Sequence, residues 1–461
     1  MPRPPLILGF AALLALQGAS LHAQSASQWQ AEQIAASDKS EHIMREANTH
    51  KGLLAQYQVM RYAYVADKQP AFRLIFGQYL SWYQTFIGDY PDAAASFSIR
   101  QPALRDDHPS PLSDASWQAR PALQAIPELA SKYQLVFLNE AHNIPLTRSL
   151  TVQLLSKLRQ EGFNYFAVET IYQTDTQLQS RGYPTSKSGF YTEEPISAEM
   201  VRTALKLGFK VIGYEALSNA TGDAREAEQA RNIYTHVFKP DPHARLVVEA
   251  GYAHIQKSGK FLSGSSMAEH LFKLTGINGL SVEQTMLIPH PLRDDDHPDY
   301  TAIIDRLHPT TPIVFENRAG QPWALRPGYD VSVIFPTQQM LRGRPTWLSL
   351  GGLRQPYFVG GERCEHHYPC MIEARYASEG ADAIPADRMV LDPIPLNPTL
   401  NDRIRQGQAA PVGDLYLRPG KYDLTIVDQN NRQIFFQKIT MPVPTEDKAM
   451  NTPSDASPTP P

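Results

Sequence analysis

The segment LVFLNEAH, at residues 135–142, is an apolar run that ends on Glu140 and His142. Three other apolar runs end in the same way. YFAVE at 165–169 and KVIGYE at 210–215 end on a glutamate, and RLVVEAGYAH at 245–254 ends on a histidine. Glutamate is depleted in β-strands and is seldom buried without a partner. Its recurrence at the ends of strand-like runs therefore marks a special position in the fold.

Helical patterns separate these runs, at residues 147–160, 197–207, 223–237 and 265–275. More strand-like runs follow, at residues 280–286, 312–316 and 331–335. Alternation of strands and helices predicts right-handed βαβ units on a parallel sheet. We therefore expect residues 123–338 to form an α/β domain, with a largely parallel sheet flanked by helices.

The carboxyl ends of parallel strands share one edge of a sheet, and ligands bind at that edge. We therefore expect Glu140, His142, Glu169 and His254 to converge there. Glu140 and His142 are two residues apart, so on an extended segment their side chains point the same way. Such a pair can bind one metal ion, or act as a base with its orienting acid. Gly251 would allow a sharp turn or a close approach of the backbone to a ligand.

A helix-like segment, REAEQARNI at residues 225–233, adds further polar side chains. Arg225, Gln229 and Asn232 fall on one face of this helix. An arginine directed at an edge rich in carboxylates would lower their pKa values and hold an anionic substrate. The same spacing is also typical of a surface helix with internal salt bridges.

The rest of the chain divides by composition. Residues 24–122 are mostly helical in pattern and carry an aromatic stripe, which we interpret as a packed amphipathic face. The stripe consists of Phe72, Phe76, Tyr79, Trp82, Tyr83 and Phe86. In residues 339–442, short strand-like runs between Gly and Pro predict a small β-rich, sandwich-like domain that ends in a hairpin at Asn430 and Asn431. Residues 443–461 are rich in Pro, Ser and Thr, and we expect them to be disordered.

Residues 1–23 have the pattern of a secretory signal peptide. Arg3 gives a positive start, residues 6–16 form an apolar segment too short to span a bilayer, and Ala23 offers a cleavage point. No cysteine follows this segment as a site for a lipid anchor. We therefore expect export, to the bacterial periplasm or the extracellular medium. No later stretch reaches ~18 apolar residues, so we expect no transmembrane segment in the exported chain.

The composition excludes one class of partner. The 461 residues carry a net charge of −4, which leaves no basic surface for nucleic acid. Hydrophobic residues make up 42% of the chain, enough for a sizeable core. The partner that we expect is a small-molecule or peptide substrate.

The two cysteines, Cys364 and Cys370, bound the segment CEHHYPC. In an oxidising compartment the first interpretation is a disulfide that closes a small loop. The alternative is a metal site that combines the thiols with His366 or His367. Export favours the disulfide, and so does the lack of a second ligand pair nearby.

In chain order, these segments resemble the superfamily of erythromycin-esterase-like, haem-uptake and Tiki/TraB proteins. The family pattern is a strand followed by Gly-Glu and a nearby His, a second strand ending on Glu, a helix with Arg, Gln and Asn, and a strand ending Gly-x-x-His. The matching segments here are residues 139–142, 166–169, 225–233 and 251–254. The resemblance covers residues 130–290. Asn139 replaces the usual Gly, and the Glu-x-His spacing matches the haem-uptake branch better than the macrolide-esterase branch.

The resemblance implies a shared site in a family that includes hydrolases of ester and peptide bonds and a haem binder. We expect a secreted hydrolase in which His142 or Glu140 activates water, with or without a divalent metal, for attack on an ester or amide carbonyl. Glu169 and Glu215 would orient the base or bind metal, and His254 would complete the site. No Gly-x-Ser-x-Gly motif occupies a strand end, which argues against an acyl-serine mechanism.

The expected substrate-binding residues are Arg225, Asn232 and Glu215, and the expected ligands of a metal are Glu140, His142 and His254. Two alternatives remain open. One is a protein that binds haem or a metal, with His and Tyr ligands such as Tyr252. The other is a non-catalytic interaction scaffold. The intact set of charged residues weighs against the scaffold, because unpaired buried charge is costly without a use.

Overall fold

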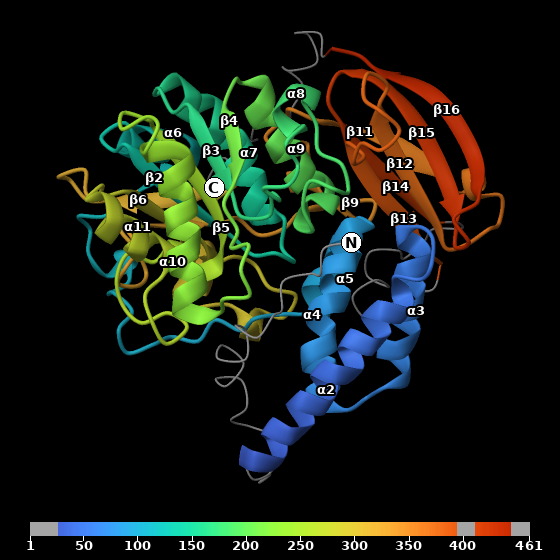
Figure 1. Cartoon of the computed structure of the whole chain (residues 1–461), viewed down its shortest axis with the longest axis horizontal. Helices are drawn as coiled ribbons and strands as arrows, with labels where there is room; N and C mark the ends of the chain where they lie inside the picture. The colour runs from blue at the N-terminus through green and yellow to red at the C-terminus, as the bar shows by residue number, and fades with distance from the viewer. Residues whose placement is uncertain (1–25, 394–410, 444–461) are drawn as a thin grey trace, which may run out of the picture.

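The computed structural model of the chain describes residues 26–393 and 411–443. Figure 1 shows an α/β unit, a group of N-terminal helices beside it, and a β-rich unit at the C-terminal end. The predicted signal peptide lies outside the described residues, and so does the predicted tail from residue 444 on. Within the described ranges, no helix is both long enough and apolar enough to cross a membrane.

The α/β unit is built on one eight-stranded sheet. Its strands are β1 (Gln118–Pro121), β2 (Leu135–Glu140), β3 (Tyr165–Val168), β4 (Lys210–Gly213), β5 (Leu246–Gly251), β6 (Leu280–Leu287), β7 (Ile313–Glu316) and β8 (Val331–Ile334). They are ordered β1-β7-β8-β6-β2-β5-β3-β4. The pairs from β8 through β4 are parallel, whereas β7 is antiparallel to both β8 and β1. The predicted α/β fold with a largely parallel sheet is confirmed.

Helices cover both faces of this sheet. The helices are α6 (Ala122–Ala130), α7 (Leu146–Gln160), α8 (Leu178–Arg181), α9 (Pro195–Lys206), α10 (Gly222–Ile233), α11 (Met267–Thr275) and α12 (Pro298–Leu307). Val136 and Leu138 of β2 pack toward α6, α7 and α9, whereas Leu135 and Phe137 pack toward α10 and α11 (Figure 1). Both faces are buried, which explains why the strands are continuously apolar rather than alternating.

The sheet begins earlier than predicted. Strand β1 pairs with β7 through residues 118–121, so the α/β unit starts before residue 123. Its sequence, QARP, contains no apolar alternation and ends on a proline. It is tolerated because β1 is an edge strand, where a missing backbone donor can face solvent.

In the described part of the N-terminal region, from residue 26 on, the α-helices are α2 (Ala26–Ala47), α3 (Leu53–Ala66), α4 (Pro70–Phe86) and α5 (Tyr90–Ser96). The predicted aromatic stripe lies on α4. Its residues are buried or partly buried in one core with residues of α2 and α3. The stripe is therefore a packing surface, and its far end also reaches the α/β unit.

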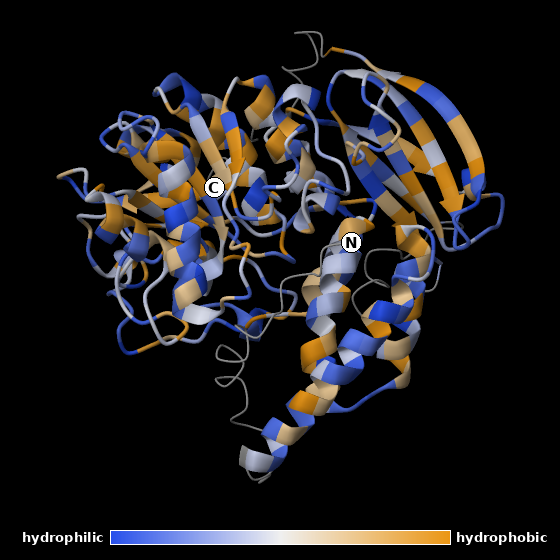
Figure 2. Cartoon of the chain, viewed as in Figure 1, coloured by the Kyte–Doolittle hydropathy of each residue, from blue (hydrophilic) through white to orange (hydrophobic). Residues whose placement is uncertain are grey.

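The C-terminal strands are β9 (Met340–Leu341), β10 (Arg344–Pro345), β11 (Gln355–Gly360), β12 (Cys370–Tyr376), β13 (Asp387–Leu391), β14 (Val412–Leu417), β15 (Gly420–Asp428) and β16 (Gln433–Met441). They form antiparallel sheets, of which β13-β12-β15-β16 and β11-β14 share one apolar core. Figure 2 shows hydrophobic and hydrophilic residues alternating along the outer strands, as expected of a sheet with one solvated face. The predicted hairpin joins β15 and β16, with Asn431 at a φ of 59°.

A buried arginine ties the three units together. Arg388 of β13 donates to the carbonyl oxygen of Phe86 in α4 at 2.5 Å, to Glu193 of the α/β unit at 3.0 Å, and to Glu373 of β12 at 2.6 Å. Its guanidinium provides rigid, directional donors to each of these oxygens. Removal of this side chain would leave the buried Glu373 and the partly buried Glu193 without their main cation.

The predicted disulfide is present between Cys364 and Cys370, at a sequence separation of 6. Replacing both cysteines by serine is expected to lower the free energy of unfolding by about 2 to 3 kcal/mol, because a loop this short restricts the unfolded chain little. Denaturation of the wild type and the double variant measures this difference. Mass spectrometry of the unreduced protein checks the bond itself, and two free thiols or bound zinc would contradict it.

Candidate functional site

The four residues predicted to be catalytic lie together at one edge of the central sheet. Glu140 is the last residue of β2, and its register partner in β5 is Gly251. Glu169 follows β3 directly, and His254 lies in the 3-10 turn that follows β5. These positions are the carboxyl ends of neighbouring parallel strands, which is where the sequence places them.

Glu140 and His142 form a buried pair. Nδ1 of His142 lies 2.6 Å from Oε1 of Glu140, and Nη2 of Arg148 lies 2.6 Å from the other carboxylate oxygen. Burial opposes ionisation of Glu140, but the charges of Arg148 and His142 outweigh it and lower the pKa of this carboxyl. Ionised Glu140 accepts the Nδ1 proton of the imidazole. Nε2 of His142 is then left with a lone pair that can take a proton.

Aromatic rings fix the orientation of His142. Tyr191 stacks on the imidazole, with ring centroids 4.1 Å apart and an interplanar angle of 11°, and Tyr252 packs edge-on at 5.2 Å. Trp82 of α4 packs on Tyr191 in turn, at 5.5 Å. Tyr252 adopts a φ of 46°, which costs energy for a residue with a side chain. The N-terminal helices and the turn after β5 therefore both help to hold this ring.

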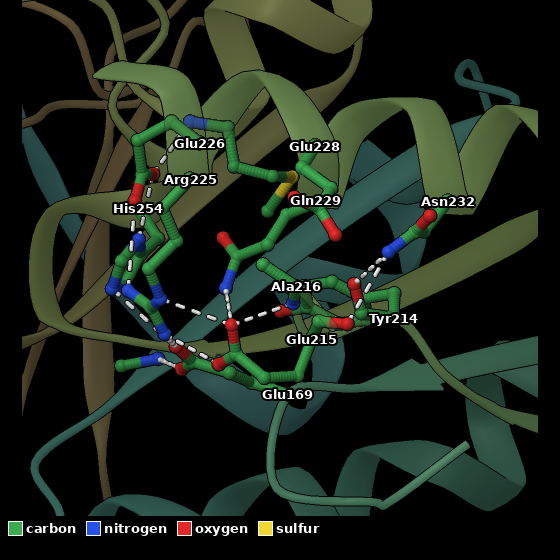
Figure 3. Close-up of polar contacts among 12 residues, drawn as sticks. Glu169, Tyr214, Glu215, Ala216, Arg225, Glu226, Glu228, Gln229, Asn232 and His254 are labelled. Carbon is green, nitrogen blue, oxygen red and sulfur yellow. Dashed lines mark hydrogen bonds and ion pairs between the residues drawn. The ribbon is translucent and has the colours of Figure 1, made fainter. Parts of the chain in front are cut away.

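His254 is oriented by a second carboxylate. Its Nδ1 lies 2.7 Å from Oε2 of Glu226 in α10, and its Nε2 lies 3.4 Å from Oε1 of Glu169 (Figure 3). Glu226 also accepts the backbone N–H of Met267 at 2.9 Å. Burial would lower the pKa of His254, but the charges of Glu226 and Glu169 outweigh burial and raise it. The surroundings of His254 therefore favour its imidazolium form.

Glu169 lies between the two histidines. One of its oxygens accepts the N–H of Gly251 at 2.7 Å, and the other accepts from Arg225 at 2.9 Å. A side-chain carbon at Gly251 would lie 2.7 Å from Nε2 of His142 and 3.2 Å from Oε2 of Glu169. The ring and the carboxylate therefore face the same point of the backbone. Burial would raise the pKa of Glu169, but the charges of His254 and Arg225 bring it down to about 2.

The residues predicted to bind substrate are joined to one another by hydrogen bonds and an ion pair. Nε of Arg225 donates to Glu215 at 3.0 Å, and Nη2 contacts both Glu215 and Glu169. Gln229 donates to the Glu215 carboxylate at 3.1 Å, and Asn232 donates to the Glu215 carbonyl at 3.2 Å (Figure 3). Arg225 thus directs its donors at carboxylates of the site. Contact of these residues with substrate stays a prediction.

Four residues of this region are absent from the predicted site: Arg148, Tyr191, Glu226 and Glu249. Glu226 had a usable signal, because residues 226, 229, 230 and 233 have helical spacing and form the buried face of α10. The face predicted from the sequence begins at Arg225 instead, and it is offset by one residue from this buried face. Arg148 and Glu249 lie in buried segments, and no spacing rule relates them to the glutamates at the strand ends.

The predicted metal ligands Glu140, His142 and His254 do not form one coordination group. Both oxygens of Glu140 are engaged, by Arg148 and by Nδ1 of His142. Nδ1 of His254 is engaged by Glu226. Across residues 26–393 and 411–443, no three His, Cys, Asp or Glu side chains are arranged to hold a metal ion. Bound metal, like bound haem, stays a prediction from the family resemblance.

Comparisons with known proteins find only distant structural similarity. No family model matches the chain, and no curated protein matches it. The structure of the type III effector HopBA1 is similar at 14% identity and a TM-score of 0.28, over 38% of this chain and 88% of that chain. A structure described as bacterial protein toxins is similar at 12% identity and a TM-score of 0.28, over 38% of each chain. At this TM-score neither likeness supports an inference about function.

The contact between Gly251 and His142 can be tested by a double-mutant cycle. Gly251 has a φ of −70°, which alanine adopts without strain, so the cost of Gly251→Ala should come from overlap with the imidazole. We expect it to lower the free energy of unfolding by about 1 to 3 kcal/mol. In a His142→Ala background the cost should fall by more than half. Denaturation of the four proteins measures both values, and an equal cost in both backgrounds would contradict the contact.

The pKa of His254 should depend on Glu226. Glu226→Gln removes the strongest charge that favours the imidazolium, so the pKa of His254 is expected to fall. The His254 contribution to stability, which is lost as the pH rises through its folded pKa, should then disappear at a lower pH. NMR titration of the His254 ring protons measures the shift. Glu228→Gln is the matched control on α10, because Glu228 binds Ser218 instead. An equal shift in both variants would count against the pairing.

Proposed function

We propose that the chain is an exported hydrolase of ester or amide bonds, and that it belongs to the superfamily that its motifs resemble. One observation carries the proposal. Two buried histidines meet at one edge of the sheet, and each has Nδ1 on its own carboxylate. A carboxylate on Nδ1 fixes the tautomer and the plane of the ring, as general acid–base catalysis requires. The disulfide is compatible with export, which is part of the proposal.

The different partners of the two histidines assign them different roles. His142 shares Glu140 with Arg148, whose positive charge offsets that of the carboxylate. Its Nε2 is the general base in our proposal. His254 faces Glu226 and Glu169, which favour its protonated form, so its Nε2–H is the general acid. In active sites that use one titratable group as the acid and another as the base, different surroundings move the pKa values of the two groups apart.

In the proposed reaction, Nε2 of His142 takes a proton from water while the water oxygen bonds to the carbonyl carbon of the substrate. Protonated His254 then donates a proton to the leaving oxygen or nitrogen as the bond from that atom to the carbonyl carbon breaks. The products are a carboxylic acid and an alcohol or an amine. Return of the proton from His142 to His254 restores the starting state, and Glu169 stabilises positive charge on either ring throughout.

His142→Ala and Glu140→Gln are expected to lower kcat/KM by about 10²- to 10⁴-fold, because each removes or misaligns the general base. The matched control is His270→Ala, which breaks a similar histidine–carboxylate pair with Asp223, away from these strand ends. The assay uses a panel of chromogenic esters and peptides, with and without Mn²⁺, Co²⁺ or Zn²⁺. The melting temperature of each variant shows whether the fold is intact.

The same set of proteins separates the alternatives. Hydrolysis that survives in both site variants would place the active site elsewhere in the chain. Absence of hydrolysis, together with a Soret band or a metal content that His142→Ala removes, would indicate a binding protein. Absence of all three would indicate a non-catalytic scaffold.

A further inference from the structure

Another carboxyl lies behind the edge at which Glu140 and His142 meet. Glu249 is in β5, with Leu138 and Val168 as its register partners on either side, and 2% of its surface is exposed. Its Oε1 has no hydrogen-bond partner within the described residues. A buried carboxylate without a partner is strongly disfavoured, and such a group takes up a proton instead. The reaction proposed above does not use Glu249.

Charged groups on neighbouring elements lie near enough to Glu249 to act on its carboxyl electrostatically. They are Glu140 at the end of β2, Arg148 of α7, and Glu169 after β3. Tyr214, which follows β4, donates its hydroxyl to the Glu249 backbone carbonyl at 2.8 Å. Two negative charges and one positive charge therefore act on this side chain. A further negative charge at Glu249 would be repelled by both neighbouring carboxylates.

The positive charge near Glu249 is already engaged. Nη2 of Arg148 lies 2.6 Å from Glu140, and its Nη1 lies 3.3 Å from Glu194. The Glu194 carboxylate is also held by two backbone N–H groups at the start of α9. An ionised Glu249 would compete with both carboxylates for the same guanidinium. Glu140 would then lose part of the contact that keeps it in place beside His142.

We propose that Glu249 is a positioning residue that acts as a neutral carboxylic acid. A neutral Glu249 does not attract the Arg148 guanidinium away from Glu140 and Glu194. Glu140 therefore keeps its contact with Nδ1 of His142. Burial, reinforced by the negative charge of Glu140, raises the pKa of Glu249 well above 4.5, which agrees with this role. The inference deepens the proposed hydrolytic function, and it rests on that function for its kinetic consequence alone.

The proton on Glu249 has a consequence for stability that needs no substrate. An unfolded glutamate titrates near 4.5, and Glu249 in the folded chain titrates higher. At a pH between the unfolded and the folded pKa of Glu249, the folded chain binds one proton more than the unfolded chain. The free energy of unfolding therefore falls as the pH rises. Relative to Glu249→Gln, which has no such proton, the unfolding constant of the wild type should rise about tenfold per pH unit in this window.

Urea unfolding of the wild type and of Glu249→Gln, from acid to alkaline pH, measures this ratio. The control is Glu128→Gln, which removes an exposed carboxylate of α6 that pairs with Arg120. Infrared spectra at neutral pH should show a protonated-carboxyl band that Glu249→Gln weakens and Glu128→Gln does not. A ratio for Glu249→Gln that does not change with pH, or an unchanged band, would mean that Glu249 is ionised in the fold and would overturn the proposal.

The positioning role has its own readout. As the wild type is titrated to the pH at which Glu249 ionises, the NMR signal of the Nδ1 proton of His142 should shift, and kcat/KM should fall. Glu249→Gln should lack both changes while keeping the neutral-pH rate. Identical titrations in the two proteins would overturn the role. If the chain hydrolyses nothing, the proposed function fails, but the stability, infrared and NMR measurements still decide the state and effect of Glu249.

Discussion

The geometry of the site depends on the ionised carboxylate of Glu169. It accepts the N–H of Gly251, binds Arg225 and lies against His254, so it joins the end of β3 to α10 and to the turn after β5. A buried anion is stable only when cations and N–H groups surround it closely. The missing side chain at Gly251 lets the ring of His142 reach the same place. The Glu169 carboxylate therefore holds His254 beside the point of the backbone that the His142 ring faces.

Two arginines in this region each bind two carboxylates. Arg148 serves Glu140 and Glu194 on the α7 side of the sheet, and Arg225 serves Glu169 and Glu215 on the α10 side. Arginine suits both positions because its planar fork can contact two carboxylates at once and does not lose its proton. The arrangement gives the two histidines different surroundings, with Glu140 and Arg148 beside His142, and Glu226 and Glu169 beside His254.

The sequence was informative where the chemistry follows from the strand itself. Parallel strands must end at one edge, so the convergence of Glu140, Glu169 and His254 could be expected from their positions alone. The positions of Arg148 and Tyr191 could not be expected, because their contacts depend on how α7 and the 3-10 turn before α9 pack on the sheet. The early start of the sheet at β1 was missed for a related reason, since an edge strand of four residues needs no apolar pattern. Tertiary packing determines these contacts and the start of the sheet, and a local sequence pattern carries no information about such packing.

Residues 190–193 contact all three units of the chain. Phe190 packs on Phe86 of the N-terminal helices, Tyr191 on His142, and Glu193 binds Arg388 of the β-rich unit. The sheet alone therefore does not complete the site. An α/β unit separated from its neighbours would retain the histidines and glutamates of the edge, yet would lose the packing that keeps the Tyr191 ring against His142. Among related chains, replacements in α4 should accordingly be accompanied by replacements at position 191.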